Sequence, residues 1–188
     1  KQKETDWTKR WRELELICDK YRGSNGNSYD CAIAVSGGKD SHFQTHIIKD
    51  KLKMNPLLLS VGNFDWTETG RKNLDNLSDA FGCDTILLQP NRKLGRIMLK
   101  KAFEEIGSPM WYPDALIYSF PVRMCMKLGI RLLIYGEDIN YFYGGEFDTE
   151  TPSALLQSKN DVVKPVWDIW FKDKQIDEKE LEMAKQPD

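Results

Sequence analysis

The sequence lacks the features that mark several classes of protein. No apolar run approaches the roughly 20 residues that a membrane-spanning helix needs, and no signal peptide is recognisable at its start. The formal net charge is -2 over 188 residues, and no basic stripe is apparent, so charge predicts no affinity for nucleic acid. The four cysteines stand far apart, without a C-x-x-C pair: Cys18, Cys31, Cys83 and Cys125. This spacing argues against a zinc knuckle or a disulfide framework and favours a reducing cytoplasm.

Two common nucleotide-binding motifs are missing as well. Neither the Walker A spacing G-x-x-x-x-G-K-[ST] nor the Rossmann spacing G-x-G-x-x-G occurs. His42 and His46 lie four residues apart on a predicted helix, but the glutamate of a zincin motif is absent between them. We therefore expect these histidines to pack or to be exposed, and we expect no metal pair.

Apolar runs alternate with segments of helical periodicity along the chain. Strands are expected at 29–35, 56–61, 85–88 and 131–135, and helices at 6–21, 40–53, 67–81, 93–106 and 114–128, with a kink or division at Pro121. The alternation predicts an α/β fold with a doubly wound, mostly parallel sheet. We divide the chain into an N-terminal helix and linker (1–25), a central domain (26–149) and an irregular tail (150–188) that packs on the domain or on a partner. A short charged helix is expected near its end, at 177–185.

Several apolar side chains are expected to attach the helices to this domain. Trp7 and Trp11 fall on one helical face, and we expect them to anchor the first helix, with substrate stacking as the alternative. Phe43, Ile47 and Leu52 are expected to face inward from the helix at 40–53.

A loop of small, basic and acidic residues follows the first predicted strand, and it reads Ser36-Gly37-Gly38-Lys39-Asp40-Ser41. Glycines let the backbone approach a ligand closely, and the amides and dipole of the next helix favour an anion. The hydroxyls and Lys39 suit a leaving pyrophosphate. Asp40 is expected to cap the helix or to help hold Mg²⁺ on the phosphates, and we favour the cap. Two further loops, at 62–66 and 136–145, follow strands at the same carboxyl edge of the sheet, where ligands bind.

This loop resembles the pyrophosphate loop (PP-loop) of the ATP pyrophosphatase superfamily, with its Rossmann-like adenine nucleotide alpha hydrolase fold. The resemblance implies that ATP and Mg²⁺ are bound, that an acceptor oxygen takes AMP while pyrophosphate leaves, and that a nucleophile then displaces AMP. Further sequence blocks narrow the resemblance to one family within this superfamily. They are Asp65-Trp66-Thr67-Glu68, Gly70-Arg71, Pro109-Met110-Trp111, Pro121-x-Arg123, Tyr135-Gly136-Glu137-Asp138 and Tyr143-Gly144-Gly145. Together they are similar to the N-acetyl sugar amidotransferases of bacterial surface-polysaccharide (lipopolysaccharide, O-antigen) biosynthesis.

The narrower resemblance implies a substrate and a partner. A nucleotide-linked N-acetyl sugar would be converted to an acetamidino sugar, with ammonia supplied by a separate glutaminase subunit. Nucleic acid and membrane insertion are not expected, and homo-oligomerisation is left open. The chain differs from the usual family pattern at Asp114, Asp138 and Phe142.

The resulting candidate residues fall into three groups. Expected catalytic residues are Lys39, Asp40 and Glu137. Expected contacts to ATP are Ser36, Gly37, Gly38, Lys39, Asp40, Ser41, Asn63 and Gly136. Expected contacts to the sugar substrate are Asp65, Trp66, Arg71, Trp111, Arg123, Tyr143, Gly144 and Gly145, because arginine forks match oxyanions and tryptophan rings stack on sugars.

Two alternatives remain open. One is a PP-loop enzyme that transfers sulfur or nitrogen to tRNA, and the acidic balance of the chain counts against it. The other is a non-catalytic domain that only binds a nucleotide.

Overall fold

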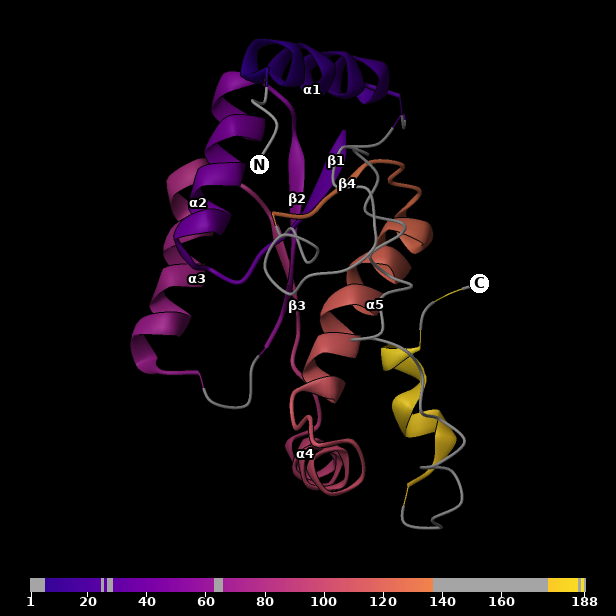
Figure 1. Cartoon of the computed structure of the whole chain (residues 1–188). Coiled ribbons are helices and arrows are strands. Elements are labelled where there is room, and N and C mark those ends of the chain that lie inside the picture. Colours follow the sequence, from indigo (N-terminus) through magenta and orange to yellow (C-terminus); the bar gives the residue numbers. More distant parts are fainter. Residues whose placement is uncertain are drawn as a thin grey trace.

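The structure is a computed structural model, and it describes residues 6–24, 26, 29–62, 66–136, 176–185 and 187. The elements are arranged around one sheet (Figure 1). Their bounds are α1 Trp7–Tyr21, β1 Cys31–Ala34, α2 Lys39–Thr45, the π-helix η1 His46–Lys51, β2 Pro56–Val61, α3 Glu68–Phe81, β3 Thr85–Leu88, α4 Arg92–Ile106, α5 Trp111–Leu128, β4 Leu133–Ile134 and the 3₁₀-helix η4 Glu178–Ala184.

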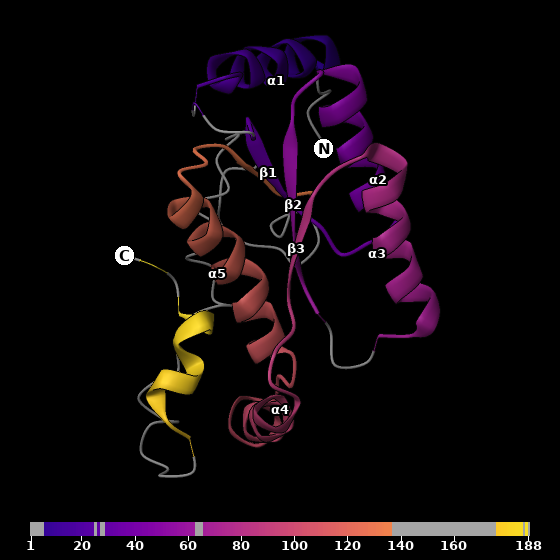
Figure 2. The ribbon, with the colours of Figure 1, turned by 180° about the vertical axis from the view of Figure 1, so that it is seen from behind.

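The four strands form one parallel sheet in the order β3-β2-β1-β4. In its register Ile33 of β1 pairs with Leu58 of β2 on one side and with Ile134 of β4 on the other. Helices α2 and α3 cover one face of the sheet and α5 covers the other, as the two opposite views show (Figures 1 and 2). This arrangement confirms the predicted doubly wound parallel α/β sheet.

Strand β2 is apolar along most of its length because both of its faces are covered. Leu58 belongs to the core cluster under η1 and α3, whereas Leu57 and Leu59 belong to the cluster under α5. All three side chains are at most 1% exposed. A continuous apolar run is therefore what a strand in this position requires.

Polar side chains cap the amino ends of α1, α3 and α4. Asp6 accepts from the backbone N–H of Lys9 at the start of α1, and Thr67 accepts from that of Gly70 at the start of α3. Asn91 caps α4 in the same way. These caps satisfy amides that have no partner within the helix, and they explain why α1, α3 and α4 begin within a residue of the predicted positions.

Helix α5 continues through Pro121 as one helix and begins at Trp111, so the expected division at the proline is wrong. Pro121 is itself buried within the most apolar of the long helices, where packing compensates for the lost backbone hydrogen bond. The helix lies between the sheet on one side and α4 and η4 on the other. Among the described residues, no helix is both long enough and apolar enough to cross a bilayer.

Two expectations about apolar side chains are wrong. Trp7 is 76% exposed and Trp11 is 38% exposed; α1 is instead held to the core by Leu14 and Cys18, which lie further along the same face. Phe43 is 67% exposed on α2 rather than inward-facing. Periodicity identified the helices correctly. It could not show which apolar residues of a helix are covered by the rest of the protein, because that depends on how far the helix extends past the sheet.

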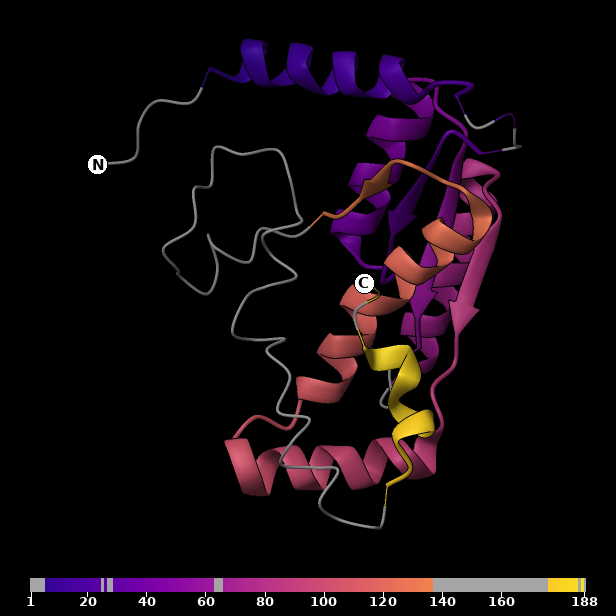
Figure 3. The same cartoon turned by 90° about the vertical axis from the view of Figure 1, so that its right-hand side faces the viewer.

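The last described segment, residues 176–185, packs against α5. Leu181 is fully buried between α4 and α5. Ser119 donates its hydroxyl hydrogen to the carbonyl of Met183 at 2.6 Å, and Arg123 donates to the carbonyl of Lys185 at 3.0 Å. The side view shows η4 (yellow) beside α5 and above α4 (Figure 3). A segment far away in the sequence thus completes the core on this side of the sheet.

We predict that Leu181→Ala lowers the free energy of unfolding by about 2–4 kcal/mol, because it leaves a cavity where a fully buried side chain stood. Urea denaturation measures the change. Met126→Ala on α5 is the control, because Met126 is 60% exposed. It should change the free energy of unfolding by less than about 0.5 kcal/mol. Equal stability of the two variants would show that residues 176–185 do not pack as described.

Candidate functional site

The Ser36–Ser41 loop lies at the carboxyl end of β1, in the middle of the sheet. From β1 the chain moves outward to β2 and β3, and it then returns to place β4 on the opposite side of β1. The helices change faces at the same point, since α2 and α3 lie on one face and α5 on the other. Such a reversal of strand order opens a crevice at the carboxyl ends of the two strands involved, and it is where open α/β sheets bind ligands.

Ser41 joins the two ends of the Ser36–Ser41 loop by a hydrogen bond on its buried side. Its side chain is 4% exposed. Its hydroxyl accepts from the backbone N–H of Ser36 at 2.9 Å and lies 3.3 Å from the hydroxyl of Ser36. Its own carbonyl accepts from the hydroxyl of Thr45 at 2.7 Å, one turn further along α2. Ser41 was expected to contact ATP, but in this structure its hydroxyl fixes the shape of the loop.

Gly37 lies against the backbone of α3. Its φ is +83°, in the left-handed region that side chains with a Cβ rarely adopt. A Cβ at this position would lie 2.9 Å from the backbone nitrogen of Leu74. The loop can therefore pack on α3 only if glycine occupies position 37.

The amino terminus of α2 has no side-chain cap, although α1, α3 and α4 each have one. Gly38 takes the capping position and offers no polar side chain. Backbone N–H groups of the first turn are consequently available to an anion, and the helix dipole adds to their positive potential.

Lys39 and Asp40 extend into solvent beside these amides, with side chains 88% and 76% exposed. The ammonium of Lys39 donates to both carboxylate oxygens of Asp40, at 2.7 and 2.9 Å. The prediction that Asp40 caps the helix is therefore wrong, because its carboxylate is paired with Lys39 instead. An exposed pair of this kind is weak enough to rearrange when a more highly charged anion arrives.

Gln44 connects the ends of β1 and β4. Its side-chain N–H donates to the carbonyl of Ala34 at 3.0 Å, and a Cβ at Gly136 would lie 2.5 Å from its side-chain oxygen. That oxygen is buried and has no hydrogen-bond partner among the described residues. Sequence reasoning missed Gln44, although a polar residue one turn after Ser41 on the inner side of the loop helix was a usable signal.

Two predicted residues, Trp66 just before α3 and Arg71 in its first turns, lie against each other. The guanidinium of Arg71 lies 5.8 Å from the centre of the Trp66 ring, a cation–π distance. Trp66 packs partly against the core cluster that contains Leu74, the residue touched by Gly37. Nearby, a Cβ at Gly62 would lie 2.7 Å from the side chain of Gln89, so the ends of β2 and β3 also meet closely.

Two residues predicted to bind substrate, Trp111 and Arg123, pack or hydrogen-bond within the protein instead. Trp111 is 3% exposed within the cluster formed with α4 and residues 176–185, and it has no free ring face to stack on a sugar. Arg123 donates to the carbonyl of Lys185 and pairs with Glu182 at 3.1 Å. Both expected substrate contacts are corrected accordingly: these side chains join α5 to its neighbours.

The other predicted residues lie outside the described part of the chain. They are Asn63, Asp65, Glu137, Tyr143, Gly144 and Gly145, and the family differences at Asp138 and Phe142 lie there too.

None of the four cysteines is a nucleophile in this structure. All four are buried. Burial raises the pKa of each thiol, and for Cys125 it raises the pKa to about 12. The thiolate that nucleophilic chemistry needs is therefore scarce at neutral pH.

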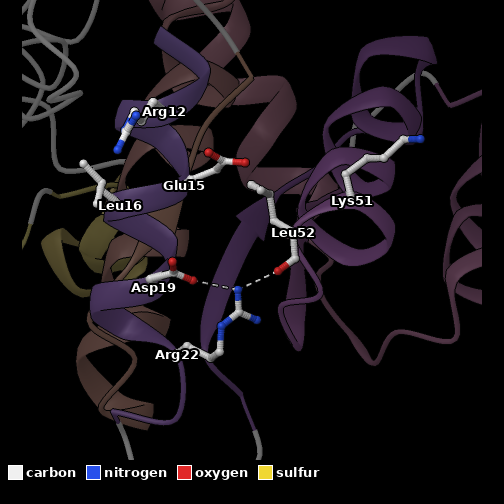
Figure 4. Close-up of a pocket in the computed structure, with 7 residues that line it drawn as sticks. All are labelled: Arg12, Glu15, Leu16, Asp19, Arg22, Lys51 and Leu52. Atoms are coloured by element: carbon white, nitrogen blue, oxygen red, sulfur yellow. Dashed lines mark hydrogen bonds and ion pairs between the residues drawn. The ribbon is translucent and has the colours of Figure 1, made fainter. Parts of the chain in front are cut away.

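A separate cavity of about 420 Å³ lies between α1 and the end of η1 (Figure 4). Charged residues of both signs line it, and Arg22 is already bonded to Asp19 and to the carbonyl of Leu52. The same guanidinium reaches the carbonyl of Lys53, just before β2. The cavity thus lies at the amino edge of the sheet, opposite the Ser36–Ser41 loop, and one of its charge pairs, Arg22 with Asp19, is already formed.

No protein-family model matches the chain. A curated protein of Methanocaldococcus jannaschii, described as an uncharacterized protein, is 28% identical over 130 residues, which cover 69% of this chain and 46% of that protein. This chain therefore spans less than half the length of that relative.

We predict that Gly37→Ala destabilises the protein by about 2–4 kcal/mol, because it adds backbone strain and a collision with α3. Gly82→Ala is the matched control, since Gly82 has φ +56° and nothing within 4 Å of its added Cβ, so only the strain of about 1–2 kcal/mol remains. Urea denaturation compares the two. If Gly37→Ala were no worse than Gly82→Ala, the contact between the loop and α3 would be refuted.

Proposed function

We propose that the protein is an ATP pyrophosphatase of the PP-loop type, which binds ATP at Ser36–Ser41 and releases pyrophosphate. The observation that carries the proposal is the uncapped amino terminus of α2, directly behind a closed, glycine-containing loop at the reversal point of the sheet. Backbone amides, a helix dipole and an exposed lysine converge there. A pyrophosphate gains negative charge as it leaves, and donors already in position stabilise that charge in the transition state.

Each residue of the loop has a defined part in this proposal. Ser41 and Gly37 hold the loop against β1 and α3. The amides that follow Gly38 bind phosphate oxygens. Lys39 leaves Asp40 and pairs with the pyrophosphate, which offers more charge than one carboxylate.

A magnesium ion would be held mainly by the phosphates. Among the described residues there is no group of three potential metal ligands. Mg²⁺ usually binds one or two carboxylates together with substrate phosphates and water, and Asp40, once Lys39 has moved, offers one such carboxylate. The residues present therefore fit a phosphate-bound Mg²⁺, which would neutralise charge on the leaving pyrophosphate.

Within this class, we propose an amidotransferase that acts on a nucleotide-linked N-acetyl sugar. The sequence blocks around Trp66, Arg71 and Gly136 support this substrate, and these residues lie around the loop at the carboxyl edge. The amide oxygen of the sugar attacks the α-phosphorus of ATP, and the bond to pyrophosphate breaks. Ammonia then adds to the amide carbon, AMP leaves with the former amide oxygen, and loss of a proton yields the acetamidino group.

Ammonia must come from another protein in this proposal. Ammonia is mostly ammonium at neutral pH, so a source close to the site is advantageous. The four buried thiols of this chain do not suit glutamine hydrolysis. We propose a separate glutaminase subunit as the source.

We predict that Lys39→Ala lowers pyrophosphate release by about 10²–10³-fold, the usual effect of removing one stabilising donor. The assay contains the full-length protein, ATP, Mg²⁺, an ammonium salt and a panel of nucleotide-linked N-acetyl sugars. Lys51→Ala is the matched control, because Lys51 lies at the opposite edge of the molecule, and it should keep wild-type activity. Turnover near the wild-type rate in Lys39→Ala would contradict the role of the loop.

The same assay distinguishes the alternatives. Pyrophosphate release that no sugar stimulates would contradict the sugar amidotransferase. Release stimulated by tRNA would favour a tRNA-modifying enzyme, and binding of ATP without any release would favour a nucleotide-binding domain.

A further inference from the structure

Helix α4 begins with three exposed cations on one side. Arg92, Lys93 and Arg96 fall within its first two turns, and all three side chains are exposed. Arg92 and Arg96 are one turn apart and share a face, with Lys93 adjoining them. The buried residues of α4, including Leu94 and Met98, lie on the opposite side against α5 and residues 176–185. The chain as a whole shows no basic stripe, but the first two turns of α4 carry a local cluster of cations.

This positive charge is not neutralised within the described part of the chain. Lys100, further along the helix, pairs with Glu104 at 3.8 Å, whereas no ion pair joins Arg92, Lys93 or Arg96 to another described residue. No acidic residue stands in the first turn of α4. Cations at the positive end of a helix dipole are unfavourable for stability, so helix stability does not explain their placement.

The three cations lie at the ligand-binding edge of the sheet. Helix α4 starts a few residues after the carboxyl end of β3, and Gln89, just before it, touches Gly62 at the end of β2. Strands are spaced by about 4.8 Å, and β3 ends two residues beyond the level of Ala34, so the end of β3 lies about 12 Å from that of β1. Figures 1 and 3 show α4 beyond the end of β3, at the opposite end of the molecule from α1, and Val61 and Leu88, the last residues of β2 and β3, pack against the cluster that contains Leu94 of α4. An extended ligand that reaches the Ser36–Ser41 loop therefore passes close to the start of α4.

We infer that Arg92, Lys93 and Arg96 bind the diphosphate of the nucleotide-linked acceptor, while ATP occupies the loop after β1. This inference rests on the proposed function, because it assumes an acceptor that carries a diphosphate. Guanidinium groups form paired hydrogen bonds with phosphate oxygens, and the two arginines one turn apart present two such forks. The separation between the two anion sites leaves room for the sugar, whose amide then faces the α-phosphate of ATP.

The test measures acceptor binding without turnover. UDP-N-acetylglucosamine, UDP and free N-acetylglucosamine are titrated calorimetrically into the full-length protein in the presence of a non-hydrolysable ATP analogue. We expect the double variant Arg92→Ala/Arg96→Ala to weaken binding of both UDP compounds about 10- to 100-fold. Affinity for the ATP analogue should stay unchanged.

The matched control is Lys100→Ala/Lys101→Ala, which removes the same charge from the same helix further from the carboxyl edge. It should leave the affinity for the UDP compounds within about twofold of wild type. A second test variant, Arg92→Lys/Arg96→Lys, keeps the charge and should recover part of the affinity, because lysine lacks the paired donors. Urea denaturation verifies that each variant is folded.

Several outcomes would overturn the inference. These are wild-type affinity in the double alanine variant, an equal loss in the lysine control, or no binding of UDP compounds by the wild-type protein. Loss of tRNA binding with intact binding of UDP compounds would assign the cations to RNA instead. A protein that binds UDP-N-acetylglucosamine through both arginines but releases no pyrophosphate with any sugar would refute the proposed function and leave this diphosphate site standing. A protein that releases pyrophosphate without needing the arginines would refute the site alone.

Discussion

The close approach of the Ser36–Ser41 loop to the backbone of α3 is the contact on which the arrangement of the candidate site depends. Only glycine at position 37 allows it, because a side chain would meet the backbone at Leu74. The hydroxyl of Ser41 fixes the loop from the other side by holding the N–H of Ser36. Once the loop is seated between β1 and α3, α2 starts without a side-chain cap, and its first amides remain available to an anion.

The parallel sheet brings separate parts of the chain to this loop. All four strands are parallel, so their carboxyl ends lie along one edge of the sheet. Contacts of Gln44 with Ala34 and Gly136, and of Gln89 with Gly62, set the spacing between adjacent strand ends. The opposite side of the molecule is stabilised by apolar packing of α4, α5 and residues 176–185. The residues of the candidate site are thereby concentrated at one edge, and apolar clusters lie on both faces of the sheet.

Much of the fold could be predicted because local signals and burial agree. The bounds of β2 and β3 match the prediction, because each is a short apolar run between polar turns, and β2 is moreover covered on both faces. The predicted substrate contacts differ from the structure where a residue type commonly serves either a site or the core. Arg123 could bind an oxyanion or a carbonyl, and it binds the carbonyl of Lys185. Trp111 could stack on a ligand or fill the core, and it fills the core. Gln44 was overlooked because its importance comes from a strand that lies about 90 residues later in the chain.

The sequence alone determined the order of strands and helices, the parallel α/β class and the position of the glycine-containing loop after β1. These properties depend on local periodicity, on glycine and on short-range hydrogen bonds, all of which can be recognised in a continuous stretch of residues. Only the tertiary structure decided that β4 lies beside β1, that Ser41 faces inward, that Trp7 is exposed and that three cations of α4 have no ion-pair partner among the described residues. Each of these properties depends on which distant segment covers a residue, and local periodicity carries no information about that.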